Sequence, residues 1–442
     1  MYLRYLIIAL FISCLTPHQL LLSQKNTSSP IKDLITINQN HLSYLTKKNS
    51  NKTLISKQSQ KKHYQRFLKK YFSPWNISKK NQKKPPTLFL QNLHKNPYFK
   101  ENKQKITHHQ IKAITNNINS NEYPNYQKKA ITIVNTNIRK LPTNKPLFEK
   151  FSDNSNGFPF DILQNTALPA NTPIYIKHIT KDNAWVYIQT ALASGWVSIQ
   201  DIAYTNKKFI KKFTSYTSHI CITTDNISLF STDHTYLYKT YIGMTYPLIS
   251  KTKRNYKILI ARVGKKRKAY LDVARISKLN AAKAPLIMTT KNIATLSNKL
   301  INQPYGWGGL FNNRDCSSMI RDLFSPFGIW LPRNSKSQAK SLGNYTKIAH
   351  LSDFKKEKYI LNNAIAYKTL LWLPGHIMLY IGKKNNKALV FHNIWGLRSI
   401  DEMKRIIIGK AVITTLKPGS EINHIDKSFN FLNQIQTISI IK

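Results

Sequence analysis

Three residues in the last part of the chain, Cys316, His376 and His392, have side chains that together could cleave an amide bond. A cysteine attacks an amide carbonyl when a base takes its proton, and a neutral imidazole can take that proton and return it to the leaving amine. A further polar group must fix the tautomer of this imidazole. The three residues could supply these roles in chain order. At such wide spacing they lack the close ligand pair of a metal site.

Each residue also has a simpler structural explanation. Cys316 could be a small buried apolar residue. His376 could be a strand-end residue with its ring in solvent, and His392 could be a hydrogen-bonded residue of the core. The combination of all three, with the cysteine at the start of a helix, favours catalysis over the separate explanations.

The residues around Cys316 predict that it lies on the first turn of a helix. Asp315 is a preferred N-cap residue. Apolar residues then recur at helical spacing, at Ile320, Leu323, Phe324 and Phe327. The backbone N–H groups at a helix start lack helical partners and the dipole there is positive, so both favour a thiolate. Before the helix, Gly306, Gly308 and Gly309 form a loop that can approach a ligand closely.

Two strand-like runs, residues 375–382 and 388–393, follow and carry one histidine each, with a polar turn at 383–387 between them. Which residues of an antiparallel pair share a face depends on the register. In a regular hairpin His376 and His392 share a face only if the turn has an odd number of residues, three or five. A turn of two or four residues without a bulge would place them on opposite faces.

The middle of the chain predicts two small β-barrels. Short strand-like runs with turns between them lie at residues 173–176, 184–188 and 195–197, and a second set includes 227–230 and 256–261. Residues 283–286 are typical of a linker into the last domain. Cys221 lies between Ile220 and Ile222, which favours a role in core packing.

The N-terminus is typical of an exported protein. Arg4 precedes an apolar run from residue 6 to residue 15, which is too short to span a bilayer and suits a signal segment. Residues 11–14 resemble the lipobox of bacterial lipoproteins, which makes Cys14 a candidate for lipidation; ordinary cleavage nearby is the alternative. The polar, basic residues from 23 to 72 suggest a disordered tether.

The chain carries 68 Lys and Arg against 19 Asp and Glu, a formal net charge of +49. Such a charge suits nucleic acid or an anionic surface. The lysines are spread along the chain together with many Asn and Ile residues, so a biased composition explains them equally well. With an apparent signal segment and no recognition motif, we expect no nucleic-acid partner, and an anionic cell-envelope surface stays open.

Three motifs of the last domain resemble the NlpC/p60 family of cysteine peptidases, which have a papain-like fold. They are residues 304–309 (PYGWGG), 314–318 (RDCSS) and 374–382 (PGHIMLYIG). The Gly195-Trp196-Val197 run and residues 137–143 resemble the bacterial SH3-type modules and N-terminal stabilising region of the subgroup that trims cell-wall peptides. The commoner motif has Gly where this chain has Ser318, which puts in question how closely a substrate approaches there.

The resemblance assigns roles by position. Cys316 matches the nucleophile, His376 the base and His392 the third polar residue. Tyr305 matches a tyrosine that helps to hold the reacting carbonyl. Residues that match the specificity side of the cleft are Asp315, Ser317 and Ser335, for which helix capping or an ordinary hydroxyl is the alternative. A residue of the first barrel would grip the substrate's amine; the candidates are Asp161, Asp182 and Tyr187.

The predicted fold class is therefore α+β: a papain-like peptidase domain, two SH3-like barrels and a mostly irregular or helical N-terminal region. The predicted divisions are 1–22 signal, 23–72 tether, 73–150 stabilising region, 151–208 first barrel, 209–284 second barrel and 285–442 peptidase domain. Carried over from the family, the activity is hydrolysis of D-γ-glutamyl–diamino acid bonds in peptidoglycan peptides, released rather than wall-bound.

We expect the protein to act in the periplasm or cell envelope, with peptidoglycan peptides as partner, no cofactor and no transmembrane span in the mature chain. Three other functions stay open. The peptidase domain could be inert and the protein only bind the wall, which the intact Cys316, His376 and His392 argue against. The fold could instead support an amidase or an acyltransferase. A basic nucleic-acid binder is the least favoured.

Overall fold

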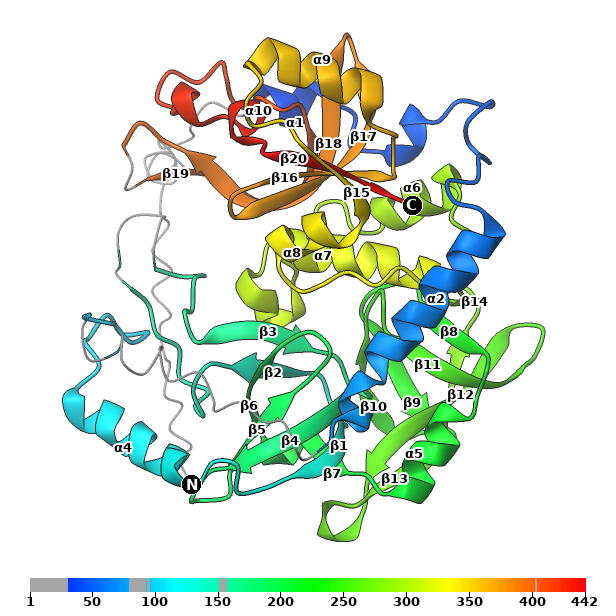
Figure 1. Cartoon of the computed structure of the whole chain (residues 1–442), viewed down its shortest axis with the longest axis vertical. Coiled ribbons are helices and arrows are strands. Elements are labelled where there is room, and N and C mark those ends of the chain that lie inside the picture. Colours follow the sequence, from blue (N-terminus) through cyan, green and yellow to red (C-terminus); the bar gives the residue numbers. More distant parts are fainter. Residues whose placement is uncertain (1–30, 79–92, 94–95, 150, 152–156, 402–403) are drawn as a thin grey trace, which may run out of the picture.

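The computed structural model describes residues 31–78, 93, 96–149, 151, 157–401 and 404–442. The predicted signal segment and Cys14 lie outside the described residues. Three antiparallel sheets dominate this part of the chain, and the predicted α+β class is confirmed. In Figure 1 the sheet of the C-terminal domain lies at the top, the other two sheets lie below it, and α7 and α8 lie between.

The first β domain has strand order β3-β2-β6-β5-β4-β1-β7. Its strands are β1 Lys128–Thr132, β2 Thr136–Arg139, β3 Gln164–Leu168, β4 Pro173–Ile179, β5 Trp185–Gln189, β6 Ser194–Ser198 and β7 Ile202–Tyr204. The predicted boundary at residue 151 is wrong, because β1 and β2 already belong to this sheet. The sequence hid this because a long connection separates β2 from β3.

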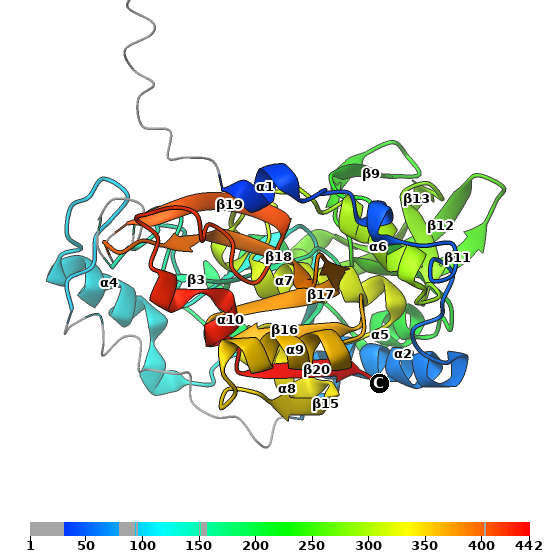
Figure 2. The ribbon, with the colours of Figure 1, turned by 90° about the horizontal axis from the view of Figure 1, so that it is seen from above.

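The second β domain has strand order β10-β9-β13-β12-β11-β8-β14. Its strands are β8 His219–Ile222, β9 Ile227–Ser231, β10 Tyr236–Thr240, β11 Thr245–Lys251, β12 Asn255–Val263, β13 Ala269–Ser277 and β14 Ala281–Ala284. Helix α5, Lys207–Thr214, connects the two β domains and buries Phe209 and Phe213. Seen from above, β11–β13 and helix α4, His108–Ile118, lie at opposite sides of the molecule (Figure 2).

The C-terminal domain has strand order β15-β20-β16-β17-β18-β19. Its strands are β15 Gly343–Lys347, β16 Thr369–Leu373, β17 His376–Lys384, β18 Lys387–Arg398, β19 Arg405–Thr414 and β20 Thr437–Ile441. Its helices are α6 Thr290–Asn298, α7 Cys316–Phe324, α8 Ser335–Ser341, α9 Asp353–Asn363 and α10 Phe431–Gln434. One core, around Ile320 and Phe391, packs α6 and α7 on the sheet. A second core, around Ile360 and Val390, packs α9 and α10 on it.

The prediction of a disordered tether is wrong for residues 31–72; residues 23–30 lie outside the described part. Helices α1, Lys32–Thr36, and α2, Lys57–Tyr71, occur there, and α2 follows one flank from the C-terminal domain to the β domains (Figure 1). Ile37 and Leu54 join the core of the C-terminal domain. Gln60 donates from Nε2 to the carbonyl oxygens of Leu286 (2.6 Å) and Phe327 (3.0 Å). The segment has no apolar period because it completes a core formed by other elements.

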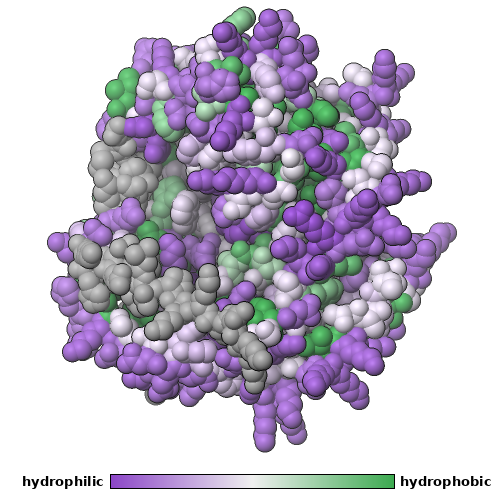
Figure 3. Space-filling view, viewed as in Figure 1, coloured by the Kyte–Doolittle hydropathy of each residue, from purple (hydrophilic) through white to green (hydrophobic). Residues whose placement is uncertain are grey.

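Hydrophilic residues cover most of the coloured surface in Figure 3, and hydrophobic residues form small separate groups among them. Among the described residues, no helix combines the length and apolar character that a membrane crossing needs.

Candidate active site

Helix α7 begins at Cys316, as its sequence predicts, and Asp315 caps it. The Asp315 carboxylate accepts a 2.8 Å hydrogen bond from the backbone N–H of Ser318, whose hydroxyl accepts one from the backbone N–H of Asp315 at 2.9 Å. Cys316 is 7% exposed and belongs to the core around α7. Its Sγ lies 3.8 Å from the carbonyl oxygen of Gly375, the residue before His376. The thiol therefore sits at the start of β17.

Burial raises the pKa of Cys316 to about 12, and the charge of Asp315 acts in the same direction. The backbone N–H groups of Ile377 and Ser317 and the charge of Arg333 act in the opposite direction. Burial of the thiol therefore opposes the thiolate that the backbone N–H groups at this helix start favour, because the anion is desolvated in a nearly closed site.

The two histidines lie on one face of the β17–β18 hairpin, although its turn differs from the predicted one. Lys384 pairs with Lys387, so the turn contains only Asn385 and Asn386. A bulge between Tyr380 and Gly382 shifts the register by one residue. On the His376 side of the bulge the paired residue numbers add to an even value, so His376 and His392 share a face. A regular hairpin would need an odd-numbered turn for a shared face; this hairpin has a two-residue turn, and the bulge provides the extra residue.

His376 and His392 are in direct contact, with 2.8 Å between Nε2 of His376 and Nδ1 of His392. His392 is fully buried, and its Nε2 lies 3.0 Å from Oγ1 of Thr414. The Phe431 ring of α10 packs on both imidazoles, at centroid distances of 5.8 Å from His376 and 5.3 Å from His392. No hydrogen bond connects either imidazole to Cys316, whose Sγ instead contacts the carbonyl oxygen of Gly375 beside His376.

Burial lowers the pKa of His376 to about 4, with Asp315 acting in the opposite direction. Burial also lowers the pKa of His392 well below its usual value, and His376 adds to this effect. Both imidazoles are therefore neutral near pH 7, as is the thiol. A neutral imidazole can accept a proton, so the pair is in the protonation state that a general base requires.

Asp315 is part of a polar cluster beside the nucleophile. Arg333 binds both carboxylate oxygens of Asp315, at 2.6 and 3.1 Å, and donates to the hydroxyl of Ser317 at 2.9 Å. Burial opposes ionisation of Asp315, but Arg333 and the bonds from Ser318 hold its pKa below the usual value. The sequence places Asp315 and Ser317 together, but nothing in the local sequence around Arg333 marks it as their partner.

Tyr305 and Ser335 have different surroundings. Burial raises the pKa of Tyr305 well above its usual value, and the charges of Cys316 and Asp315 act in the same direction. Ser335, at the start of α8, accepts a 3.3 Å hydrogen bond from Nε1 of Trp372. Ser335 has no described contact with Cys316 or the histidines, so the structure does not bring it together with the other predicted residues.

The three candidates for binding the substrate's amine are held by their own domain. Asp161 is buried and pairs with Arg139 at 2.5 Å. Asp182 accepts hydrogen bonds from Thr180 and Asn117, and Tyr187, a residue of β5, lies in the core. None of these contacts involves a residue of the C-terminal domain.

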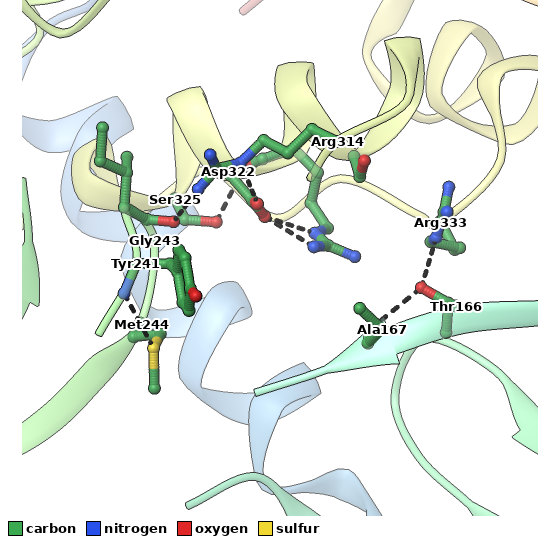
Figure 4. A network of polar contacts seen from close by, with 12 residues as sticks. Thr166, Ala167, Tyr241, Gly243, Met244, Arg314, Asp322, Ser325 and Arg333 are labelled. Atoms are coloured by element: carbon green, nitrogen blue, oxygen red, sulfur yellow. Dashed lines mark hydrogen bonds and ion pairs between the residues drawn. The ribbon is translucent and has the colours of Figure 1, made fainter. Parts of the chain in front are cut away.

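Both β domains contact the C-terminal domain close to Cys316, through the segment at residues 304–318 (the nucleophile loop) and through Arg333, the partner of Asp315. From the first, Thr166 accepts a 2.6 Å hydrogen bond from Nε of Arg333, and Gln164 donates to the carbonyl oxygen of Gly308 at 3.1 Å. From the second, Asp225 binds Arg314 through both carboxylate oxygens, at 2.5 and 3.0 Å. Figure 4 shows Arg333 reaching Thr166 on β3, and Arg314 beside Asp322. Within the described chain, no group of three or more His, Cys, Asp and Glu side chains could hold a metal ion.

Four family models match successive parts of the chain: the NLPC_P60 N-terminal stabilising domain over residues 4–123, an SH3 domain of SH3b1 type over 146–198, an SH3 domain of SH3b2 type over 208–253 and the NlpC/P60 family over 302–411. No curated protein matches the chain.

Among solved structures, the chain is similar to an NlpC/P60 endopeptidase from Photobacterium damselae subsp. piscicida. The identity is 24%, the match covers 91% of this chain and 97% of that one, and the TM-score is 0.81. It also matches an NlpC/P60 family protein from Bacillus cereus ATCC 10987 at 13% identity, over 71% of this chain and 99% of that one, with a TM-score of 0.47. The first similarity shows a shared fold over nearly the whole chain.

Proposed function

The chain is a cysteine peptidase of the NlpC/P60 family with two bacterial SH3-type domains, and on that premise we propose that it hydrolyses D-γ-glutamyl–diamino acid bonds in peptidoglycan stem peptides. The coarser activity, peptidoglycan hydrolysis, follows from the combination of a peptidase domain with wall-binding modules. The choice of bond rests on the Gly195-Trp196-Val197 run and residues 137–143, which resemble the subgroup that trims cell-wall peptides; the motifs at 304–309, 314–318 and 374–382 resemble the family as a whole.

The observation that carries the mechanism is the contact between His376 and His392 at the strand start where Cys316 lies. In this mechanism the Sγ electron pair attacks the carbonyl carbon while the thiol proton moves to His376. The protonated His376 then gives this proton to the leaving amine, and water releases the acyl group from Sγ. His392 orients His376, and the neutral hydroxyl of Tyr305 donates to the developing oxyanion.

We assign substrate selection to the wall formed by Asp315, Ser317 and Arg333 with the first β domain. Arg333 connects Asp315 to Thr166, so the domain lies directly beside the nucleophile. A neighbour at this position blocks a glycan attached to the peptide. Arg333 balances the charge of Asp315, so a free ammonium group would share that carboxylate with Arg333. The proposed substrate is therefore a released peptide with a free N-terminal L-Ala.

The test is mass spectrometry of products from free L-Ala-γ-D-Glu-diamino acid peptides and from the same peptides on N-acetylmuramic acid. We expect cleavage of the free peptides only, between D-Glu and the diamino acid. Cys316→Ala should abolish cleavage, whereas Cys221→Ala, which changes the other cysteine of the described chain, should retain it. Activity in a folded Cys316→Ala protein would refute the mechanism, and equal cleavage of both substrates would refute the selection of released peptides.

We also propose that the chain is exported to the cell envelope and anchored through Cys14. The apolar run at residues 6–15, after Arg4, supports export, and residues 11–14 support lipidation. Cell fractionation checks both steps. The wild-type chain should be in the membrane fraction and a Cys14→Ala variant should leave it; a cytoplasmic location of the wild type would contradict export.

A further inference from the structure

The hydrogen bonds of the two histidines continue into β19. Nε2 of His376 meets Nδ1 of His392 at 2.8 Å, and Nε2 of His392 meets Oγ1 of Thr414 at 3.0 Å. The Thr414 hydroxyl in turn donates to the carbonyl oxygen of Thr415 at 2.8 Å. His392 and Thr414 are both fully buried, so the contact between them has no competition from bulk water.

The contact between Thr414 and Thr415, at the end of this series, determines which group donates in each of its hydrogen bonds. A hydroxyl has one proton, and the Thr414 proton is committed to Thr415, whose carbonyl oxygen can only accept. Thr414 can therefore only accept from His392, which requires the proton of His392 on Nε2. The Nδ1 of this neutral ring then has a lone pair, and it accepts from Nε2 of His376.

We propose that Thr414 is a positioning residue that fixes the tautomers of both histidines, and so leaves Nδ1 as the unprotonated nitrogen of His376. The inference rests on the proposed function, in which that nitrogen receives the thiol proton. It assigns the base to one atom, and it extends the orienting role beyond His392 to a hydroxyl on the next strand.

The reverse tautomers would disable the same residues. If Thr414 donated to His392, the protons would move to Nδ1 of His392 and Nδ1 of His376, and the nitrogen needed as a base would be occupied. The Thr414 and Thr415 oxygens would also be 2.8 Å apart without a proton between them. Thr414 therefore acts through the histidines and not on the substrate.

The variants that test this are Thr414→Val, which removes the acceptor at nearly constant shape, and Thr414→Ser, which keeps it. Thr437→Val is a matched control: Thr437 lies on β20 of the same sheet, is 1% exposed, and its Oγ1 has no hydrogen-bond partner. We expect kcat on free muropeptides to fall about 10- to 100-fold in Thr414→Val with KM unchanged, because a buried N–H loses its partner. Thr414→Ser and Thr437→Val should stay within about twofold of the wild type.

A second readout needs no substrate. In protein with ¹⁵N-labelled histidine, ring signals assigned with His376→Asn and His392→Asn should show both residues protonated at Nε2 in the wild type, in Thr414→Ser and in Thr437→Val. Thr414→Val should lose this pattern at His392. Unchanged ring signals or unchanged kcat in Thr414→Val would overturn the inference. If the signals depend on Thr414 but the wild type cleaves no muropeptide, the proposed function fails and the tautomer assignment stands.

Discussion

The side-chain amide of Asn393 donates a 2.8 Å hydrogen bond from Nδ2 to the carbonyl oxygen of Arg314. Asn393 follows His392 on β18, and Arg314 precedes Cys316 by two residues. Neighbouring residues of a strand point to opposite faces, so β18 directs His392 toward Phe431 and Asn393 toward the nucleophile loop. One strand thus positions both the histidine pair and the segment that carries the thiol.

The first prediction concerns the ionisation of Cys316. With its pKa raised to about 12 and that of His376 lowered to about 4, the resting pair is neutral and not an ion pair. Alkylation of Cys316 by iodoacetamide, followed by mass spectrometry at that residue, should therefore be slow at pH 7 and still rise above pH 9. Replacing His376 with Ala should leave the profile unchanged. A rate plateau between pH 5 and pH 8 that His376→Ala removes would instead demonstrate an ion pair.

The second prediction concerns His219, a buried histidine outside the active site. It is 2% exposed, neither ring nitrogen has a hydrogen-bond partner, and burial lowers its pKa to about 4. An unfolded histidine binds a proton below about pH 6.5, so stability is lost as the pH falls from there toward 4.

Replacing His219 with Phe should remove this loss and the cost of the unpaired nitrogens. At pH 5 we expect the free energy of unfolding, from urea titration, to rise by about 2 kcal/mol relative to the wild type, with a smaller gain at pH 7.5. His350→Phe, at an exposed position, is the control. A destabilised His219→Phe protein at pH 5 would show that the ring makes a polar contact, for example through a bound water.

The third prediction concerns the contact between Arg314 and Asp225. Their side chains are 5% and 8% exposed, and Arg314 also binds Asp322 at 2.7 Å. Removing one member of a buried ion pair costs about 3–5 kcal/mol because the other charge stays behind. Asp225→Asn should lower the stability of the whole chain by about this amount, measured by urea unfolding, and should lower kcat because Arg314 leads directly into Asp315.

Asp233→Asn is the matched control for that variant. Asp233 also pairs with an arginine of the second β domain, Arg262, but it lies at the surface, at 3.7 Å. This change should leave stability and kcat as they are, because exposed pairs contribute little. Equal effects of the two substitutions would mean that the second β domain does not hold the nucleophile loop.

The sequence was sufficient where a local pattern determines the structure. Asp315 before an apolar helical stripe predicted the start of α7, and the two strand-like runs at residues 375–382 and 388–393 predicted β17 and β18. The sequence could not predict the register of that hairpin, because the bulge beside Ile381 depends on how β17 packs against its neighbouring strands β16 and β18. In the same way, Thr414 lies far from His392 in the chain, and only the pairing of β18 with β19 brings them together.

The N-terminal segment was mispredicted for a related reason. Residues 31–72 contain few apolar side chains, which suits disorder when the segment is considered alone. Ile37, Leu54 and Phe67 are buried nonetheless, because other elements supply the rest of each core. Composition measures what a segment can bury by itself, and this segment buries its apolar residues against the remainder of the chain.

The last prediction concerns the contact between the glycine loop and the first β domain. Gly309 has φ +86°, and a Cβ there would lie 2.6 Å from Cβ and 3.0 Å from the backbone nitrogen of Ala167 on β3. Gly309→Ala should therefore push β3 away from the loop, in addition to the strain that any side chain causes at this φ. If β3 helps to select released peptides, kcat/KM on the free peptide should fall about 10- to 100-fold.

The matched control is Gly343→Ala. Gly343 has φ +85° and thus a similar backbone strain, but its Cβ would meet only the flexible side chain of Lys442, at 3.4 Å. We expect this variant to keep the wild-type ratio of cleavage between free and N-acetylmuramic acid-linked peptides, whereas Gly309→Ala should shift that ratio toward the linked peptide. Equal losses on both substrates in Gly309→Ala would show that the contact with β3 orders the loop without restricting the substrate.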